Sequence, residues 1–152
     1  MASISSPPTP TRFASQAMAE LLVDAFLSGE IDAAGFRHAH HVEVAFGLLG
    51  RGSFLEAAAS LSSGLKAITA RAGHPGAYHE TITLAFLALI AERRAALEGE
   101  DYQRFASANA DLFDKTVLSR WYGPARLGSD LARRTFILPE PSRQGRATPS
   151  PG

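Results

Sequence analysis

The sequence predicts an all-α fold, a helical bundle with four long helices and two or more short C-terminal helices. Three observations predict it. Apolar residues recur at spacings of three and four through most of the chain. No segment alternates apolar and polar residues over the length of a useful strand. Of the 9 prolines, only Pro75 and Pro124 lie away from the two ends, so little interrupts the helical pattern.

Length and composition fit one globular domain between two tails. The chain has 152 residues, of which 45% are hydrophobic and 20% charged, enough for one core without a metal or disulfide. We expect this domain to span residues 13–138. Residues 1–12 and 139–152 are rich in Ser, Pro and Thr, a composition too polar to offset the entropy of ordering. We expect both tails to be disordered.

Charge and cysteine content exclude several classes of function. Lys plus Arg equals Asp plus Glu at 15 each, so no net field attracts nucleic acid or an anionic membrane. Cysteine is absent, which excludes thiol catalysis and leaves only nitrogen and oxygen ligands for a metal. The longest apolar stretch, residues 82–91, is far shorter than the ~20 residues of a membrane span, and no secretory signal opens the chain. We therefore expect a cytoplasmic protein.

The first two predicted helices have recognisable ends. The first, residues 13–28, ends at Gly29, which suits a helix C-terminus. The second, residues 33–49, follows Asp32, a good N-cap residue. The apolar face of the first helix consists of Met18, Leu21, Leu22, Ala25 and Phe26.

The third predicted helix opens with Ser53 and Glu56 in the spacing of a capping box and ends near Gly73. The fourth, residues 77–97, is apolar on nearly every side, which predicts the central helix. The apolar face of the third helix consists of Phe54, Ala58, Leu61, Leu65 and Ile68.

Shorter helices are expected over residues 101–108 and 110–122, with one or two more turns near 125–135 after Pro124. Aromatic and Arg residues gather in this C-terminal part and could bind an anion or a partner. The simpler interpretation is a segment clamped onto the bundle by apolar side chains. Those side chains are Trp121, Leu127, Leu131 and Phe136.

Three of the 5 histidines lie in the stretch FRHAHHVEVAF, residues 36–46. At 100° per residue, His38 and His41 fall on the apolar stripe of the second helix, whereas His40 lies roughly opposite. The same count places His79 on the core-facing side of the fourth helix. We expect three inward-facing imidazoles.

Chain direction suggests that these rings converge. Short connections make successive long helices antiparallel, so the second and fourth helices are expected to run the same way, with their N-terminal ends together. Neutral imidazoles aimed at one point bind divalent transition metals such as zinc, copper, nickel or iron. The first hypothesis is therefore a metal site formed by His38, His41 and His79. A catalytic metal would activate water or dioxygen for a small substrate, with Glu80 or Tyr78 handling protons.

A second hypothesis makes the protein a non-enzymatic binding or adaptor module. The histidines would then line a small-molecule pocket or make association depend on pH, and the apolar fourth helix could form a homodimer interface. Glu80 has a simpler reading as a first-turn residue favoured by the helix dipole. His74, in the loop before the fourth helix, could be a fourth ligand or a lid residue, but is more simply a solvated loop histidine. Whether the protein is an enzyme stays open.

Familiar metal and phosphate motifs are absent. The pair His79–Glu80 lacks the second histidine of the HExxH motif because Thr83 stands there. No ExxH pair, which a di-iron bundle requires, occurs, and neither a His-Asp pair nor a Gly-rich phosphate loop is found.

The segments HAHHVEVAF, YHETIT and SRWYGPARLGSDLARRTFILP, taken together, resemble a family of small uncharacterised bacterial α-helical proteins with an H-x-x-H … Y-H-E-T-x-T signature. The resemblance covers nearly all of the predicted domain and carries no established activity. Its signature positions are His38, His41, Tyr78, His79 and Thr81.

Overall fold

The computed structural model describes residues 10–99 and 101–141, with side chains from residue 16 onward, and these residues contain helices and no strand. The predicted all-α class is confirmed. The long helices are α1 (Pro10–Ser28), α2 (His38–Arg51), α3 (Phe54–Arg71) and α4 (Glu80–Ala95). The short ones are α5 (Tyr102–Ala108), α6 (Pro124–Leu127) and α7 (Asp130–Arg134), with 3₁₀ turns η1 (Ala33–Gly35), η2 (Pro75–Ala77), η3 (Ala110–Phe113) and η4 (Val117–Arg120).

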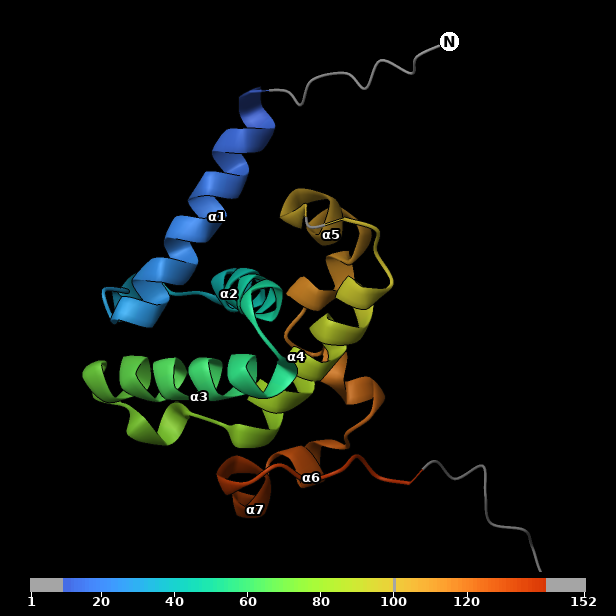
Figure 1. Ribbon diagram of the computed structural model, residues 1–152. Coiled ribbons are helices and arrows are strands. Elements are labelled where there is room, and N and C mark those ends of the chain that lie inside the picture. The colour runs from blue at the N-terminus through green and yellow to red at the C-terminus, as the bar shows by residue number, and fades with distance from the viewer. Residues whose placement is uncertain (1–9, 100, 142–152) are drawn as a thin grey trace, which may run out of the picture.

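The long helices cross one another. In Figure 1, α2 is seen almost along its axis, whereas α3 runs across the view and α4 runs up it. The expectation of antiparallel neighbours, with α2 and α4 running the same way, is therefore wrong. Only Gly52 and Ser53 separate α2 from α3, and the Ser53 hydroxyl accepts the Glu56 N–H while the Glu56 carboxylate accepts the Ser53 N–H. This capping box, as predicted, starts α3 at once, so the chain turns sharply instead of folding back.

The core lies where α2 and α4 meet the other elements. Helix α4 contacts α2, α3, η4 and α7, which confirms its predicted central place. Its side chains Leu87 and Ile90 are almost fully enclosed, as are Phe105 of α5 and Leu112 of η3. Among the described residues, no helix is both long enough and apolar enough to cross a membrane.

Two helices begin later than predicted, and both differences concern histidines. Asp32 caps the short turn η1 by accepting the Ala34 N–H, after which the backbone is extended at Phe36 and Arg37. Helix α2 therefore begins at His38 instead of residue 33, which places its histidines in the first turns.

Helix α4 begins at Glu80 instead of residue 77 because Pro75 starts the turn η2, after which Tyr78 and His79 are extended. At the N-terminus, by contrast, a helix begins earlier than predicted. Helix α1 begins at Pro10, inside the predicted tail of residues 1–12. The predicted disorder of residues 1–9 and 142–152 concerns residues outside the described ones, whereas residues 139–141 of the predicted C-terminal tail are described and form neither helix nor strand.

Helix α1 packs through part of the predicted face, because Phe26 is buried and Leu22 is half-buried against the core, but Val23 joins them in place of Met18 and Leu21. Val23 and Phe26 are buried, whereas Met18 and Leu21 are 67% and 62% exposed. A Cβ atom at Gly47 of α2 would overlap the Val23 side chain, and one at Gly64 of α3 would overlap the Phe26 ring. These two glycines let α1 pack closely against α2 and α3. Counting the spacing of apolar residues could not predict this contact, because glycine has no side chain to count.

The C-terminal segment docks on α4, but not through the predicted apolar clamp. Trp121, Leu131 and Phe136 are exposed, and Leu127 is half-buried. Tyr122 and Ala132 are buried in their place.

Hydrogen bonds hold the extended end of this segment. The Thr81 hydroxyl donates to the Thr135 carbonyl (2.8 Å) and accepts the Ile137 N–H (3.2 Å). The Tyr122 hydroxyl donates to the Ile137 carbonyl (2.9 Å). Polar contacts to the backbone, which apolar periodicity cannot predict, therefore fix the end of the described chain.

A histidine pocket as the candidate functional site

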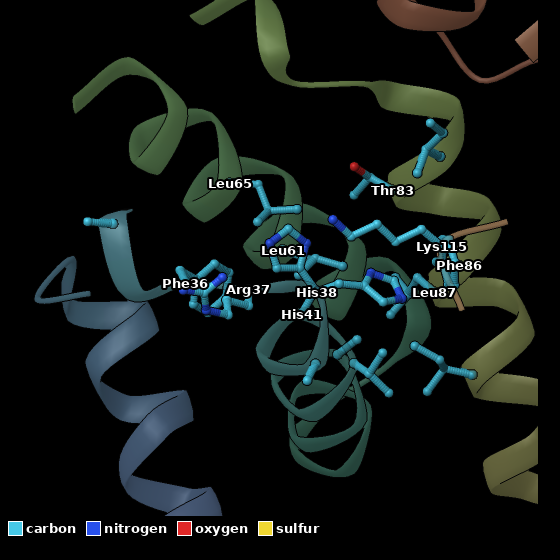
Figure 2. A pocket seen from close by; sticks show the side chains of 16 residues that line it. Phe36, Arg37, His38, His41, Leu61, Leu65, Thr83, Phe86, Leu87 and Lys115 are labelled. Carbon is cyan, nitrogen blue, oxygen red and sulfur yellow. The ribbon is translucent and has the colours of Figure 1, made fainter. Parts of the chain in front are cut away.

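A cavity of about 660 Å³ lies between α2, α3 and α4. Its inner wall is apolar, and its polar side chains come from the start of α2, from α4 and from the loop after η3 (Figure 2). We call it the histidine pocket. The apolar residues that line it are Ala34, Phe36, Ala39, Val42, Ala45, Leu61, Leu65, Ile82, Phe86, Leu87 and Ile90, and the polar ones are Arg37, His38, His41, Thr83 and Lys115.

His41 lines the pocket with its imidazole ring. Its ring stacks on Phe36 with 4.6 Å between ring centroids, and no hydrogen-bond partner for it is found in the described part of the chain. Burial, with smaller effects from His38, His40 and Lys115, lowers the pKa of His41 from 6.5 to about 4. At neutral pH the ring is therefore uncharged, with one N–H to donate and one nitrogen to accept.

His38 is the first residue of α2 and lies beside His41, with 6.3 Å between the ring centroids. Its Nε2 donates to the Leu112 carbonyl of η3 at 2.8 Å, because a carbonyl oxygen can only accept. The edge of the ring meets Phe86, 5.0 Å away. The predicted proximity of His38 and His41 is thus found.

His79 does not join them. It is the N-cap of α4, and its Nδ1 accepts the Ile82 N–H at 3.1 Å. Its Nε2 donates to the Leu127 carbonyl at 2.7 Å, so both nitrogens of the buried ring are engaged with backbone. The ring is absent from the lining of the histidine pocket.

The predicted convergence of His38, His41 and His79 is therefore wrong in its geometry. It assumed co-directional helices and placed His79 inside α4, whereas the helices cross and α4 begins one residue after His79. Within residues 10–99 and 101–141, no group of three or more His, Asp or Glu side chains could hold a metal ion. The residues do not fit a three-histidine centre, and binding of zinc, copper, nickel or iron stays a prediction.

Tyr78 and Glu80, the predicted proton-handling residues, lie outside the lining of the pocket. The Tyr78 hydroxyl donates to Ser62 at 2.9 Å, and burial raises its pKa. The Glu80 carboxylate lies 3.8 Å from the Lys66 amino group, and that group also lies 5.0 Å from the centre of the Tyr78 ring. These contacts tie the start of α4 to α3.

The two remaining histidines have local roles. The Nδ1 of His40 accepts the Arg37 N–H at 2.9 Å and so closes the first turn of α2. His74 is exposed in the loop before η2, as the simpler interpretation expected.

Sequence reasoning missed Lys115 and Arg37. Figure 2 shows the Lys115 side chain reaching over the pocket on the side of His38 and His41. Arg37 stands at the N-terminus of α2 beside Phe36. No sequence signal could have found Lys115, because its place depends on how the loop between η3 and η4 crosses α2 and α4.

Neither a protein-family model, nor a curated protein, nor a solved structure matches this chain. The resemblance to a family of bacterial helical proteins consequently stays a prediction.

Proposed function

We propose that this protein binds a small, largely apolar organic molecule in the histidine pocket. The observation that carries the proposal is a cavity of about 660 Å³ with an apolar wall and, at one side, an uncharged imidazole that has no hydrogen-bond partner among the described residues. Ligand pockets in proteins occupy roughly 300–1,000 Å³ and combine an apolar lining with a few polar groups. Protein interiors are otherwise close-packed, and this cavity, which is open to solvent at the start of α2, reaches buried side chains such as Ala45 and Leu87.

The polar groups of the pocket favour binding over catalysis. The only hydroxyl among the described lining residues is that of Thr83, which donates to the His79 carbonyl at 2.8 Å. His38 is likewise engaged with a backbone carbonyl. Among the described lining residues, no free hydroxyl is therefore placed to act as a nucleophile beside His38 or His41.

The volume of the cavity limits the size of the ligand that it can hold. Water takes about 30 Å³ in the liquid, so 660 Å³ suits a molecule of roughly ten to twenty non-hydrogen atoms. A molecule of that size would contact α2, α3 and α4 together.

The test is binding of a neutral, environment-sensitive fluorophore, N-phenyl-1-naphthylamine, by the full chain. We expect saturable enhancement of its emission by the wild-type protein. Replacing Ala45, which lines the wall and is buried, by Leu should occupy part of the cavity and weaken binding about tenfold or more, a loss of about 1.4 kcal/mol.

The matched control is Ala70→Leu, on the exposed side of α3, which should bind as the wild type does. If Ala45→Leu does not fold, Ala39→Trp at the exposed rim of the pocket replaces it. Absence of saturable binding by the wild type, or unchanged binding by a folded wall variant, would overturn the proposal.

A further inference from the structure

The charges around the histidine pocket point to a narrower class of ligand, and this step rests on the proposed function. We infer that the ligand is an organic anion, a carboxylate on an aliphatic or aromatic body, held with its charged end toward Lys115 and His41. The apolar body would lie against the wall formed by α3 and α4.

The first argument is the one-sided charge of the lining. Arg37 and Lys115 contribute positive charge, and none of the described lining residues is Asp or Glu. Asp114, next to Lys115, is outside the lining; it is exposed and accepts the Thr116 N–H and hydroxyl at 2.9 and 2.7 Å, and its weaker electrostatic interactions are with Arg120 and His38. Glu43 is on α2 but is not part of the lining.

The second argument is that the Lys115 amino group has no carboxylate partner among the described residues. Over the residues that the structure describes, no carboxylate lies within ion-pair distance of its amino group. The chain's other lysine, Lys66, has one in Glu80. Figure 2 shows the Lys115 side chain over the pocket beside the two histidines, and after burial, His38 and His40 it is the smallest of the causes that lower the pKa of His41. An anion placed between Lys115 and His41 would meet a cation on one side and an N–H donor on the other.

The third argument is the start of α2. Its first turn contains no acidic residue, although the positive end of a helix dipole favours one. The sequence instead places Arg37, His38 and His41 there. An anionic ligand would supply the negative charge that this end of the helix lacks.

Other head groups fit less well. An ammonium group would face Arg37 and Lys115 with like charge and no carboxylate among the described lining residues. A hydroxyl could accept from His41 but carries no charge to attract Lys115, which is exposed at the rim of the pocket. A carboxylate can accept from both.

The experiment uses three ligands with the same ten-carbon chain, decanoate, decan-1-ol and decylamine, each below its micellar concentration. Displacement of N-phenyl-1-naphthylamine from the full chain at pH 7.5 measures their affinities. We expect decanoate to bind about tenfold or more tightly than decan-1-ol and decylamine to bind most weakly.

Lys115→Met then removes the charge and keeps the length of the side chain. It should weaken decanoate about tenfold and change decan-1-ol less than about twofold. Lys66→Met, whose charge lies on α3 outside the pocket lining, should change neither.

The outcomes separate the two proposals. Equal affinities for decanoate and decan-1-ol, or equal losses for both in Lys115→Met, would overturn the anion inference and leave the proposed binding function standing. Binding of none of the three ligands, together with no saturable binding of the fluorophore, would overturn the binding function itself.

Discussion

His41 shows how a protein can keep a histidine uncharged without giving it a hydrogen-bond partner of its own. Its ring lies against Phe36, and burial, with smaller electrostatic effects from His38, His40 and Lys115, lowers its pKa to about 4. Keeping a titratable ring in such a place costs stability at low pH. A ligand-binding site that needs a neutral N–H donor beside an apolar cavity would explain why the protein tolerates this loss of stability.

The low pKa of His41 predicts that stability falls in mild acid. The unfolded chain takes up a proton near the ordinary pKa of 6.5, whereas the folded chain resists it until about pH 4. The free energy of unfolding should therefore fall as the pH is lowered from about 6.5 to 4, by up to about 3 kcal/mol from this group. Urea denaturation at pH 7 and 4.5 measures the loss.

The variant His41→Gln should show a smaller loss, and His74→Gln, at an exposed loop residue, should behave as the wild type. An equal loss in wild type and His41→Gln would show that other groups cause the acid sensitivity.

His79 is predicted to be a structural residue. Replacing it by Ala removes the N-cap of α4 and the bond to Leu127, which should lower the free energy of unfolding by about 2–4 kcal/mol. His79→Asn should recover about 1 kcal/mol, because Asn caps a helix well but does not reach Leu127. Equilibrium denaturation measures both, and a cost below about 0.5 kcal/mol for Ala would contradict this role.

The sequence predicts the position of a side chain well only where that position depends on a single helix. Counting along α2 correctly placed His38 and His41 together, because residues three apart share a face. It failed for His79, whose role depends on where Pro75 lets α4 begin. It could not find Lys115, whose place depends on tertiary structure alone.

Among the helices, α1 is positioned by two glycines in its neighbours. Gly64→Ala would place a methyl group in the Phe26 ring, and this ring is nearly fully buried. The free energy of unfolding should fall by about 1–3 kcal/mol. Gly35→Ala, where nothing lies within 4 Å, should change it by no more than about 0.5 kcal/mol. Equal effects in the two variants, measured by denaturation, would rule out close packing at Gly64.

The C-terminal segment is predicted to open when its polar attachment is removed. Thr81→Val keeps the shape of the side chain but removes the bonds to Thr135 and Ile137. Amide hydrogen exchange at Ile137 should then become about tenfold faster or more, since a lost bond costs about 1–2 kcal/mol. The control is Thr69→Val, whose hydroxyl bonds the Lys66 carbonyl on α3. Unchanged exchange at Ile137 would show that apolar packing alone holds the segment.

Helix type was easier to predict than helix arrangement. Periodicity and the capping box of Ser53 gave the long helices because these signals are local. The crossing of α2, α3 and α4 was not predicted, because it depends on a two-residue connection and on which faces fit together. The central helix α4, apolar on nearly every side, was recognised because burial all round leaves no polar stripe.

Taken as a whole, the molecule combines a zero net charge with an uneven local distribution. The 15 basic and 15 acidic residues balance, yet the described lining of the one large cavity between α2, α3 and α4 contains Arg37 and Lys115 and no carboxylate. Net charge therefore gave no indication of the site. The crossing of the helices creates the cavity and brings Lys115 over it.

Methyl NMR of the full chain, titrated with decanoate, locates the ligand. The account predicts shifts and ligand-to-protein nuclear Overhauser effects at Leu61, Leu65, Ile82 and Ile90, which line the cavity. The exposed methyl groups of Leu55, Leu131 and Leu138 should stay unchanged. Shifts confined to those exposed leucines, with none at the cavity residues, would contradict a ligand-binding pocket between α2, α3 and α4.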